Sequence, residues 1–298
     1  MFDQISLDFC KGAFTVTAVI FLPKLFALIR YPSIERVHSV ANEKVPQRGD
    51  NGRITIWGIN EGTSYKSYNN GIPDQSSFTS RVVCFLRLHK LDYVKEATNM
   101  FAESPRNMVP VANVFGLMVD DSPNIIRAIK KHYGIPDPVL TTEQQALGHM
   151  VQVLMTRSFP RVLKYMIFLT ERGRYLFWEQ MKNGIPAIVR PFVKAMIFRD
   201  QYRMLKLQGI AIQREEELYA ECKKDLQSLA DTLGDKRFIL GTDEATDADV
   251  DVYVWVGHLF YNEMFTDQAW PVEMKAKFPT LLAYTGRMRK LLFPGLDC

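Results

Sequence analysis

The chain has 298 residues, of which 47% are hydrophobic and 23% charged, and its formal net charge is +4. This composition is typical of a globular protein long enough for two domains, and it excludes a disordered or collagen-like chain. A net charge this small for the length gives no indication of a nucleic-acid partner, and we expect none.

The cysteines and histidines stand apart from one another along the chain. No C-x-x-C pair and no His-Glu-x-x-His motif is present. The four cysteines are Cys10, Cys84, Cys222 and Cys298. These spacings frame neither a disulfide scaffold nor a zinc site, so we expect a reducing compartment and no metal.

An apolar run at residues 12–29 is close to the length that crosses a bilayer, although Pro23 and Lys24 interrupt it. Asp3 and Asp8 precede the run and no small-residue cleavage site follows it, which argues against a signal peptide. Basic residues follow the run, and the positive-inside rule then places the rest of the chain on the cytoplasmic or matrix side of an intracellular membrane. We expect a membrane-associated helix here, with an extra helix packed on the domain as the alternative.

The polar residues 37–52 predict a linker, and regular elements begin after it. Residues 53–59 alternate like a strand, and residues 81–89 have helical spacing. A second strand is expected at 91–96 and a third begins at residue 109. A hairpin at 115–119 completes the set, and a helix then runs from residue 121 to about residue 133. From residue 141 onward the pattern is almost entirely helical.

Two helical segments in the second half have distinctive patterns. Thr246 and Asp249 have capping-box spacing, and the residues behind them are too apolar for a solvent-facing helix, which predicts a buried central helix. Residues 185–207 place apolar side chains at helical spacing between basic ones. That stretch predicts either a surface for anionic headgroups or a protein partner, or an ordinary helix with a solvated basic face.

The segment Phe238-Ile239-Leu240-Gly241 followed by the Thr246/Asp249 box resembles the C-terminal core of glutathione-transferase-fold proteins. Further matching phrases resemble the failed-axon-connections branch of that superfamily, relatives of metaxin, and the match covers roughly residues 53–294. These phrases are Ser77-Phe78-Thr79-Ser80-Arg81, Ser104-Pro105, Val109-Pro110, Asp121-Ser122 and Phe278-Pro279.

The resemblance implies an α+β thioredoxin-like domain at residues 51–134 and an all-α domain at residues 141–298, after an N-terminal helix and linker at residues 1–50. It also implies glutathione as a cofactor. A cis proline at Pro110 would let the backbone of Val109 pair with glutathione. Asp121 and Ser122 would receive its γ-glutamyl group at a helix start. The alternative is that Ser122 only caps the helix, with Pro123 at its first position.

In thiol-active relatives a Cys, Ser or Tyr stands at the start of the first helix. That position corresponds here to Thr79, so covalent cysteine chemistry is not expected, and Cys84 lies too far into the helix to replace it. A hydroxyl of Ser76, Ser77 or Thr79 could hydrogen-bond a glutathione thiolate. The favoured alternative is that these hydroxyls only cap the helix.

Two functions follow from the resemblance. The first is a non-catalytic scaffold or accessory subunit of an intracellular membrane complex, with the mitochondrial membrane as one candidate, anchored by the N-terminal apolar run. Its partners would be other proteins of the complex or a second copy of the chain. The alternative is a glutathione-dependent transferase or peroxidase. Fold alone does not choose between them.

Overall fold

The computed structural model describes residues 52–60, 62–97, 109–182 and 185–296. The predicted N-terminal helix at residues 12–29 and nearly all of the predicted linker lie outside these ranges. Within them, no helix combines the length and the apolar character that a bilayer crossing requires.

A four-stranded mixed sheet forms the base of the N-terminal part. The strands are β1 Ile54–Gly58, β2 Tyr93–Ala97, β3 Val111–Val114 and β4 Leu117–Asp120. Their order is β2-β1-β3-β4, with β1 parallel to β2 and antiparallel to β3, and with β3 antiparallel to β4. This is the thioredoxin-like arrangement expected from the sequence, and each predicted strand is present to within a few residues.

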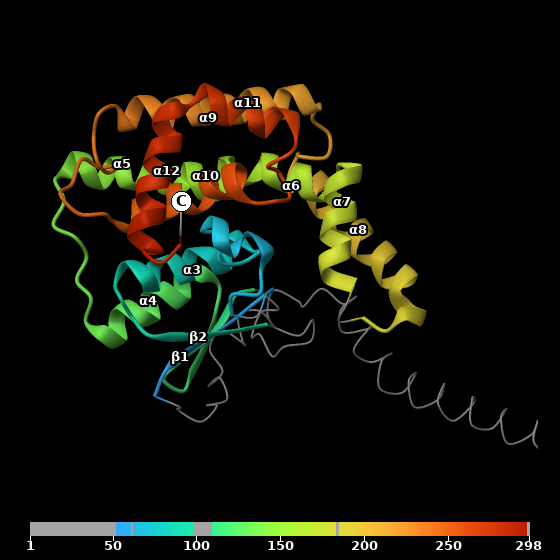
Figure 1. Ribbon diagram of the computed structural model, residues 1–298, viewed down its shortest axis with the longest axis horizontal. Coiled ribbons are helices and arrows are strands. Elements are labelled where there is room, and N and C mark those ends of the chain that lie inside the picture. The colour runs from blue at the N-terminus through green and yellow to red at the C-terminus, as the bar shows by residue number, and fades with distance from the viewer. Residues whose placement is uncertain (1–51, 61, 98–108, 183–184, 297–298) are drawn as a thin grey trace, which may run out of the picture.

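Helices α3 (Ser77–Leu88) and α4 (Ser122–Tyr133) lie together on one face of this sheet (Figure 1). Their apolar side chains and those of β1 and β3 form one buried cluster. A 3₁₀ turn, η1 (Lys66–Asn70), precedes α3. Helix α3 begins four residues before the predicted start at residue 81, because the preceding serine accepts a backbone N–H and starts the helix there.

The regular elements of the C-terminal part are all helical within its described residues, as predicted. A π-helical turn, η2, joins its first two helices, and a 3₁₀ turn, η4, precedes α8. The elements are α5 Thr142–Val153, η2 Leu154–Ser158, α6 Pro160–Phe168, α7 Glu171–Met181, η4 Ala187–Val189, α8 Arg190–Leu207, α9 Glu215–Leu233, α10 Asp247–Tyr261, α11 Ala269–Lys277 and α12 Pro279–Leu292.

Helix α10 lies at the centre of the molecule, between α3 on one side and α9 and α11 on the other (Figure 1). Residues 248–260 of α10 are all buried. They join the largest apolar cluster of the chain, to which α5, α6, α9 and α12 also contribute. The prediction of a buried central helix after Thr246 is therefore confirmed.

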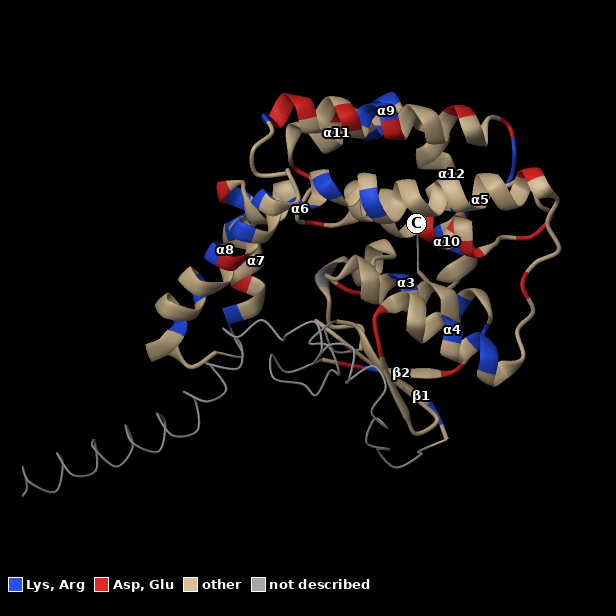
Figure 2. Cartoon of the chain, turned by 180° about the vertical axis from the view of Figure 1, so that it is seen from behind, with Lys and Arg blue, Asp and Glu red and all other residues tan. Residues whose placement is uncertain are grey.

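Helices α7 and α8 project from this body as a hairpin, and basic side chains are spread along both (Figures 1 and 2). The predicted amphipathic stretch corresponds to η4 and α8. Val193, Met196 and Leu205 are buried, as in an ordinary packed helix, whereas Phe192 and Leu207 are exposed. The apolar positions of α8 are thus divided between a packed side and an uncovered side.

Candidate functional site

The loop that leads into α3 is held by one buried carboxylate, that of Asp74. Its oxygens accept hydrogen bonds from the backbone N–H groups of Ser76 (2.8 Å), Asn60 (3.1 Å) and Ile59 (3.3 Å). The ammonium group of Lys95, on β2, lies 3.1 Å away. Burial raises the pKa of the Asp74 carboxyl, and the Lys95 charge opposes that rise. Asp74 therefore joins the end of β1 to the start of α3.

Gly58, the last residue of β1, lies directly beneath this helix start. A Cβ atom placed on Gly58 would lie 2.5 Å from an Asp74 carboxylate oxygen and 2.6 Å from a methyl carbon of Thr79. Both neighbours are themselves buried. Only glycine lets strand and helix approach this closely.

The three candidate hydroxyls at the start of α3 have different surroundings. Ser76 is the N-cap, and its Oγ accepts the N–H of Thr79 at 3.3 Å. Ser76 and Ser77 are partly exposed, whereas Thr79 is 0% exposed and its hydroxyl has no partner among the described residues. Ser76 therefore caps the helix, and whether it has a further role stays a prediction. The start of α3 already has a side-chain cap, unlike the start of α4, and only Ser76 and Ser77 of its three candidate hydroxyl-bearing residues are partly exposed.

Cys84 faces the core, as expected. It is fully buried among apolar side chains. Burial raises the pKa of its thiol, which keeps the sulfur protonated and unreactive. It does not replace the missing cysteine at the helix start.

The peptide bond between Val109 and Pro110 is cis, as the resemblance implies. Val109 is 36% exposed. The carbonyl of Pro110 accepts the N–H of Asp121 at 3.1 Å, which places the start of β3 beside the start of α4. Pairing of Trp57 with Val111 also brings the end of β1 to this position. The segments that carry Ser76, Pro110 and Ser122 therefore meet at one edge of the sheet.

The start of α4 lacks a cap from its own side chains. Asp121 is the N-cap residue, but its side chain makes no capping hydrogen bond. Its φ of 69° is uncommon for a non-glycine residue, and a conformation of this kind costs about 1–3 kcal/mol. The next residue, Ser122, is 0% exposed, and its hydroxyl has no partner in the part of the chain that the structure describes.

The alternative that Ser122 only caps this helix is wrong, because Asp121 takes the N-cap position and the Ser122 hydroxyl bonds to no backbone group among the described residues. A buried hydroxyl without a partner costs about 1–3 kcal/mol. The helix start offers free N–H groups and the positive end of the dipole. These features fit an anionic group such as the γ-glutamyl carboxylate of glutathione.

Polar contacts between α3 and α10 hold the start of α3 against the core of the protein. The guanidinium of Arg81 forms two hydrogen bonds with the carboxylate of Asp251, at 2.5 and 2.9 Å, and both groups are buried. Next to this pair, Nε2 of His258 donates to the Ser80 hydroxyl at 3.1 Å, because that hydroxyl donates its own proton to the Asp74 carbonyl. The α3 start is thus connected to the core helix.

Sequence reasoning missed Asp74 and His258. Asp74 lies in a polar loop whose composition predicts only a turn, and Lys95 is twenty-one residues further along the chain. His258 stands alone in the sequence, yet in the structure it is buried where α10 faces α3. Its position in the apolar stretch that follows Asp251 was the one available signal.

Comparisons with known proteins agree with this architecture. Residues 77–173 match the family model of the glutathione S-transferase N-terminal domain, and residues 222–288 match that of the glutathione S-transferase C-terminal domain. A curated relative, isoprene-epoxide–glutathione S-transferase from Rhodococcus sp. (strain AD45), is 27% identical over 234 residues, which cover 74% of this chain and 94% of the relative.

Solved structures show the same fold. Glutathione transferase GSTFuA3 from Phanerochaete chrysosporium aligns over 80% of this chain and 97% of its own, with a TM-score of 0.56 and 13% identity. A glutathione transferase family member from Pseudomonas fluorescens, with two glutathione bound, aligns over 88% and 98%, with a TM-score of 0.51 and 14% identity. The comparisons do not show the narrower failed-axon-connections or metaxin-like assignment.

Proposed function

Since the chain has the glutathione transferase fold, we propose that it is a glutathione-dependent transferase whose substrate site lies where β3, α3 and α4 meet. The observation that carries this proposal is the buried hydroxyl of Ser122, which has no partner among the described residues, at the uncapped start of α4. A chain that used this edge only as a scaffold would gain nothing from leaving that hydroxyl unsatisfied. The relatedness to a glutathione S-transferase from Rhodococcus supports the same activity.

Three segments of the chain would bind glutathione in this proposal. The Ser122 hydroxyl and the first N–H groups of α4 receive the γ-glutamyl carboxylate. The Asp121 carboxylate holds the ammonium group of the same residue. The backbone of Val109, exposed before the cis Pro110, pairs with the peptide backbone of the ligand like an added strand.

We assign thiolate stabilisation to Ser76. Its oxygen already accepts the Thr79 N–H, so its own proton is available for a second group. The hydroxyl donates that proton in a hydrogen bond to the glutathione sulfur, which favours the thiolate at neutral pH, and the thiol proton passes to solvent. Asp74 is a positioning residue, because its carboxylate holds the backbone of Ser76 in place.

The second substrate would be a small electrophile that the sulfur attacks. The Rhodococcus relative is an isoprene-epoxide–glutathione S-transferase, which favours an epoxide as the class to test first. In that reaction a carbon–sulfur bond forms, a carbon–oxygen bond of the strained ring breaks, and the ring oxygen takes a proton from water. The displaced electron pair stays on the oxygen, so the products balance.

The expectation of a non-catalytic membrane scaffold receives no support from these comparisons. The membrane part of that expectation falls on residues 12–29, outside the described ranges. A homodimer stays a prediction, as do the domain boundaries and the intracellular membrane. The scaffold is the second candidate, favoured by the absence of a cysteine at the Thr79 position.

The test is binding to immobilised glutathione followed by conjugation of glutathione to an epoxide and to a chloronitroaromatic electrophile. We expect the wild-type chain to bind and to turn over, and Ser122→Ala to lose most of both. Ser228→Ala, a change at an exposed serine of α9, is the matched control and should behave as wild type. Wild-type protein that is folded but neither binds nor reacts would reinstate the scaffold.

A further inference from the structure

A cavity lies at the opposite end of α3 from the proposed glutathione site. It has a volume of about 630 Å³, within the range of small-molecule sites, and lies between the loop before α3, the start of β2 and the chain after α12. Helix α3 has 12 residues and is therefore about 18 Å long. The cavity is therefore distinct from the proposed glutathione site, which lies at the Ser76 end of α3.

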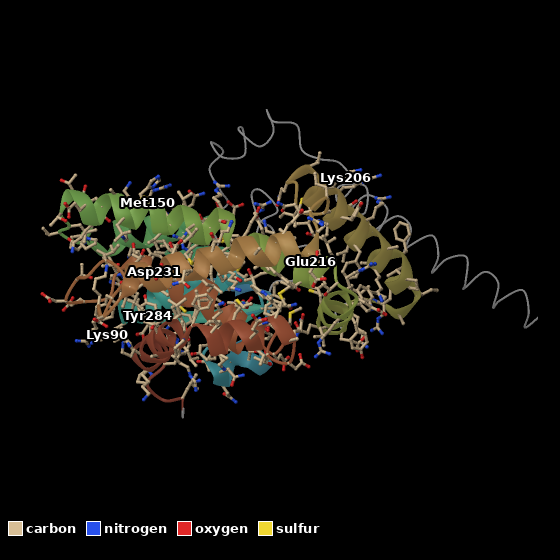
Figure 3. The ribbon with its side chains drawn as sticks, turned by 90° about the horizontal axis from the view of Figure 1, so that it is seen from above. Lys90, Met150, Lys206, Glu216, Asp231 and Tyr284 are labelled. Atoms are coloured by element: carbon tan, nitrogen blue, oxygen red, sulfur yellow. The ribbon has the colours of Figure 1, made fainter. Side chains whose placement is uncertain are left out.

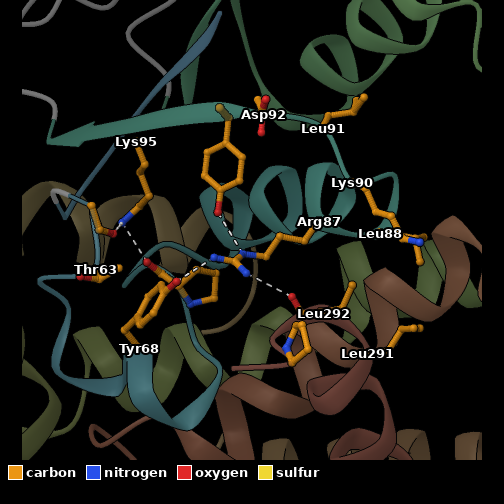
Figure 4. Close-up of a pocket in the computed structure, with 14 residues that line it drawn as sticks. Thr63, Tyr68, Arg87, Leu88, Lys90, Leu91, Asp92, Lys95, Leu291 and Leu292 are labelled. Atoms are coloured by element: carbon orange, nitrogen blue, oxygen red, sulfur yellow. Dashed lines mark hydrogen bonds between the residues drawn. The ribbon is translucent and has the colours of Figure 1, made fainter. Parts of the chain in front are cut away.

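The guanidinium of Arg87 is the central polar group of this cavity (Figure 4). It donates to the hydroxyl of Tyr93 (3.0 Å), the hydroxyl of Tyr68 (2.7 Å) and the carbonyl of Leu292 (3.2 Å). It also lies 4.5 Å from the ring centre of Phe293. Every one of these partners is uncharged.

Among the described residues, no carboxylate balances the positive charge of Arg87, because none forms an ion pair with it. A guanidinium has five N–H donors, and three are used here. The C-terminal end of α3 contributes about half a negative charge at most, which offsets only part of the cation. An anionic ligand would use the two remaining donors.

The other charges of the cavity do not alter this balance. Lys95 is buried, and the Asp74 carboxylate neutralises it. Lys90 and Asp92 also line the cavity, are both exposed and carry opposite charges. The net charge left inside the cavity is that of Arg87.

Part of the wall is apolar. Leu88, Leu91, Leu291 and Pro294 line the cavity together with the more polar Thr63. Such walls accept a hydrocarbon body, while a guanidinium selects a planar, two-oxygen head group. The cavity thus combines one cationic point with apolar sides, which is the complement of an amphipathic acid.

We propose that this cavity binds a small amphipathic monocarboxylate, with its carboxylate on Arg87 and its hydrocarbon body between Leu91 and Leu291. The proposal does not depend on glutathione binding. It assigns the chain a second ligand site at the junction between its N-terminal sheet and its last helix. A ligand held there contacts both parts.

The test is isothermal titration calorimetry with two acids and their neutral amides, 2-naphthoate against 2-naphthamide and octanoate against octanamide. An excess of S-methylglutathione is present throughout, to keep the acids from the proposed glutathione site. We expect at least one acid to bind about tenfold or more tightly than its amide, the effect of a charge-assisted hydrogen bond pair. The two bodies distinguish an aromatic from an aliphatic ligand.

Variants locate the site. Leu291 is 48% exposed, so Leu291→Glu should fold normally and place a carboxylate at the cavity wall, lowering acid affinity about tenfold or more. Leu291→Gln should bind like wild type. Leu207→Glu makes the same change at an 89% exposed leucine next to Lys206, which lies far from Lys90 (Figure 3), and should have no effect.

Arg87 itself is tested with a pair of substitutions that both remove its fixed hydrogen bonds. Arg87→Lys keeps the charge and should keep the preference for acid over amide, whereas Arg87→Gln should lose it. Thermal unfolding of both variants measures the loss of stability caused by removing these hydrogen bonds. Because both variants lose them, the difference in acid binding between the two reports the charge alone. Equal binding of acid and amide, binding untouched by Leu291→Glu, or no heat from either acid at millimolar concentration would overturn the proposal.

Discussion

The start of α10 and the start of α4 carry the same kinds of residue and differ in how their polar atoms are used. At α10, the carboxylate of Asp249 accepts four hydrogen bonds, from the N–H groups of Thr246 (2.8 Å) and Ile239 (2.8 Å) and from the hydroxyls of Thr246 (2.9 Å) and Tyr284 (2.7 Å). At α4, the Ser122 hydroxyl has no partner among the described residues.

This difference distinguishes a helix start that stabilises the fold from a helix start that binds a ligand. A buried polar group that the chain satisfies by itself stabilises the fold, and its removal leaves other groups unpaired. A buried polar group that the chain leaves unsatisfied lowers stability until a ligand supplies the partner. The first kind should appear in unfolding experiments and the second in binding experiments.

The largest effect should come from Asp249→Ala. The change leaves up to four donors without an acceptor in a fully buried position, so we expect a loss of about 3–5 kcal/mol in the free energy of unfolding, measured with denaturant. Asp243→Ala, in the exposed loop just before the helix, is the control and should change it by less than about 0.5 kcal/mol. A loss below about 1 kcal/mol at Asp249 would break the comparison.

A pH experiment tests whether His258, further along α10, is also a buried polar group that the chain satisfies by itself. Burial lowers the pKa of His258 to about 3, because the neutral ring is fully enclosed, with Asn262 at its Nδ1 and Ser80 at its Nε2. The unfolded chain binds a proton near pH 6.5, so between pH 6.5 and 3 it binds more protons than the folded chain. Stability is complete above that window and falls as the pH drops through it.

The measurement is the free energy of unfolding of wild type and His258→Gln against pH. The wild type should lose about 1.4 kcal/mol per pH unit relative to the variant below pH 6. Burial raises the pKa of Asp251 to about 6, which acts in the opposite direction, but it is present in both proteins and cancels in the difference. Parallel curves would show that the histidine is not held neutral.

Much of this comparison could be predicted from the sequence and part of it could not. The Thr246/Asp249 spacing is local, and a helix start with a buried stripe behind it follows from it directly. The alternation of β1 and the Val109-Pro110 turn were equally visible. The Ser122 hydroxyl was recognised as a candidate, but whether it caps or stays free depends on the φ of Asp121 and on packing over α4, which local pattern does not specify.

The lesson is stronger for groups whose partners are distant in the chain. The ion pair between Asp74 and Lys95 forms only when β1 and β2 pair. The hydrogen bond from Arg87 to Leu292 forms only when α12 ends beside α3. A lysine on a strand and an arginine near a helix end are each common on a protein surface. The burial of Lys95 and the contacts of Arg87 are tertiary properties.

Ser122→Ala sharpens the comparison from the binding side. Loss of a hydroxyl that hydrogen-bonds a carboxylate should weaken glutathione binding by about 1.5–3 kcal/mol, or about ten- to a hundredfold in Kd. The free protein should keep its stability or gain up to about 1 kcal/mol, because an unsatisfied buried group is removed. Calorimetric titration and denaturant unfolding of the same preparation give both values. Lower stability with unchanged affinity would make Ser122 structural.

The smallest effect concerns two threonines that are both 0% exposed, Thr79 and Thr285. The Thr285 hydroxyl lies 2.9 Å from the Leu281 carbonyl and 2.8 Å from the Tyr261 hydroxyl, whereas that of Thr79 has no partner in the described part of the chain. Thr→Val keeps the shape of the side chain in both cases. Thr285→Val should therefore destabilise the protein by about 1–2 kcal/mol, and Thr79→Val should leave it unchanged or stabilise it by up to about 1 kcal/mol.

The opposite signs are the result that matters, because shape and burial are matched and only hydrogen bonding differs. Thr79→Val should also leave glutathione conjugation within about twofold of wild type, since we assign the thiolate contact to Ser76, while Ser76→Ala should lower turnover about ten- to a hundredfold. A large loss of turnover in Thr79→Val with normal folding would transfer the thiolate contact from Ser76 to Thr79. It would also mean that the buried hydroxyl becomes accessible when substrate binds.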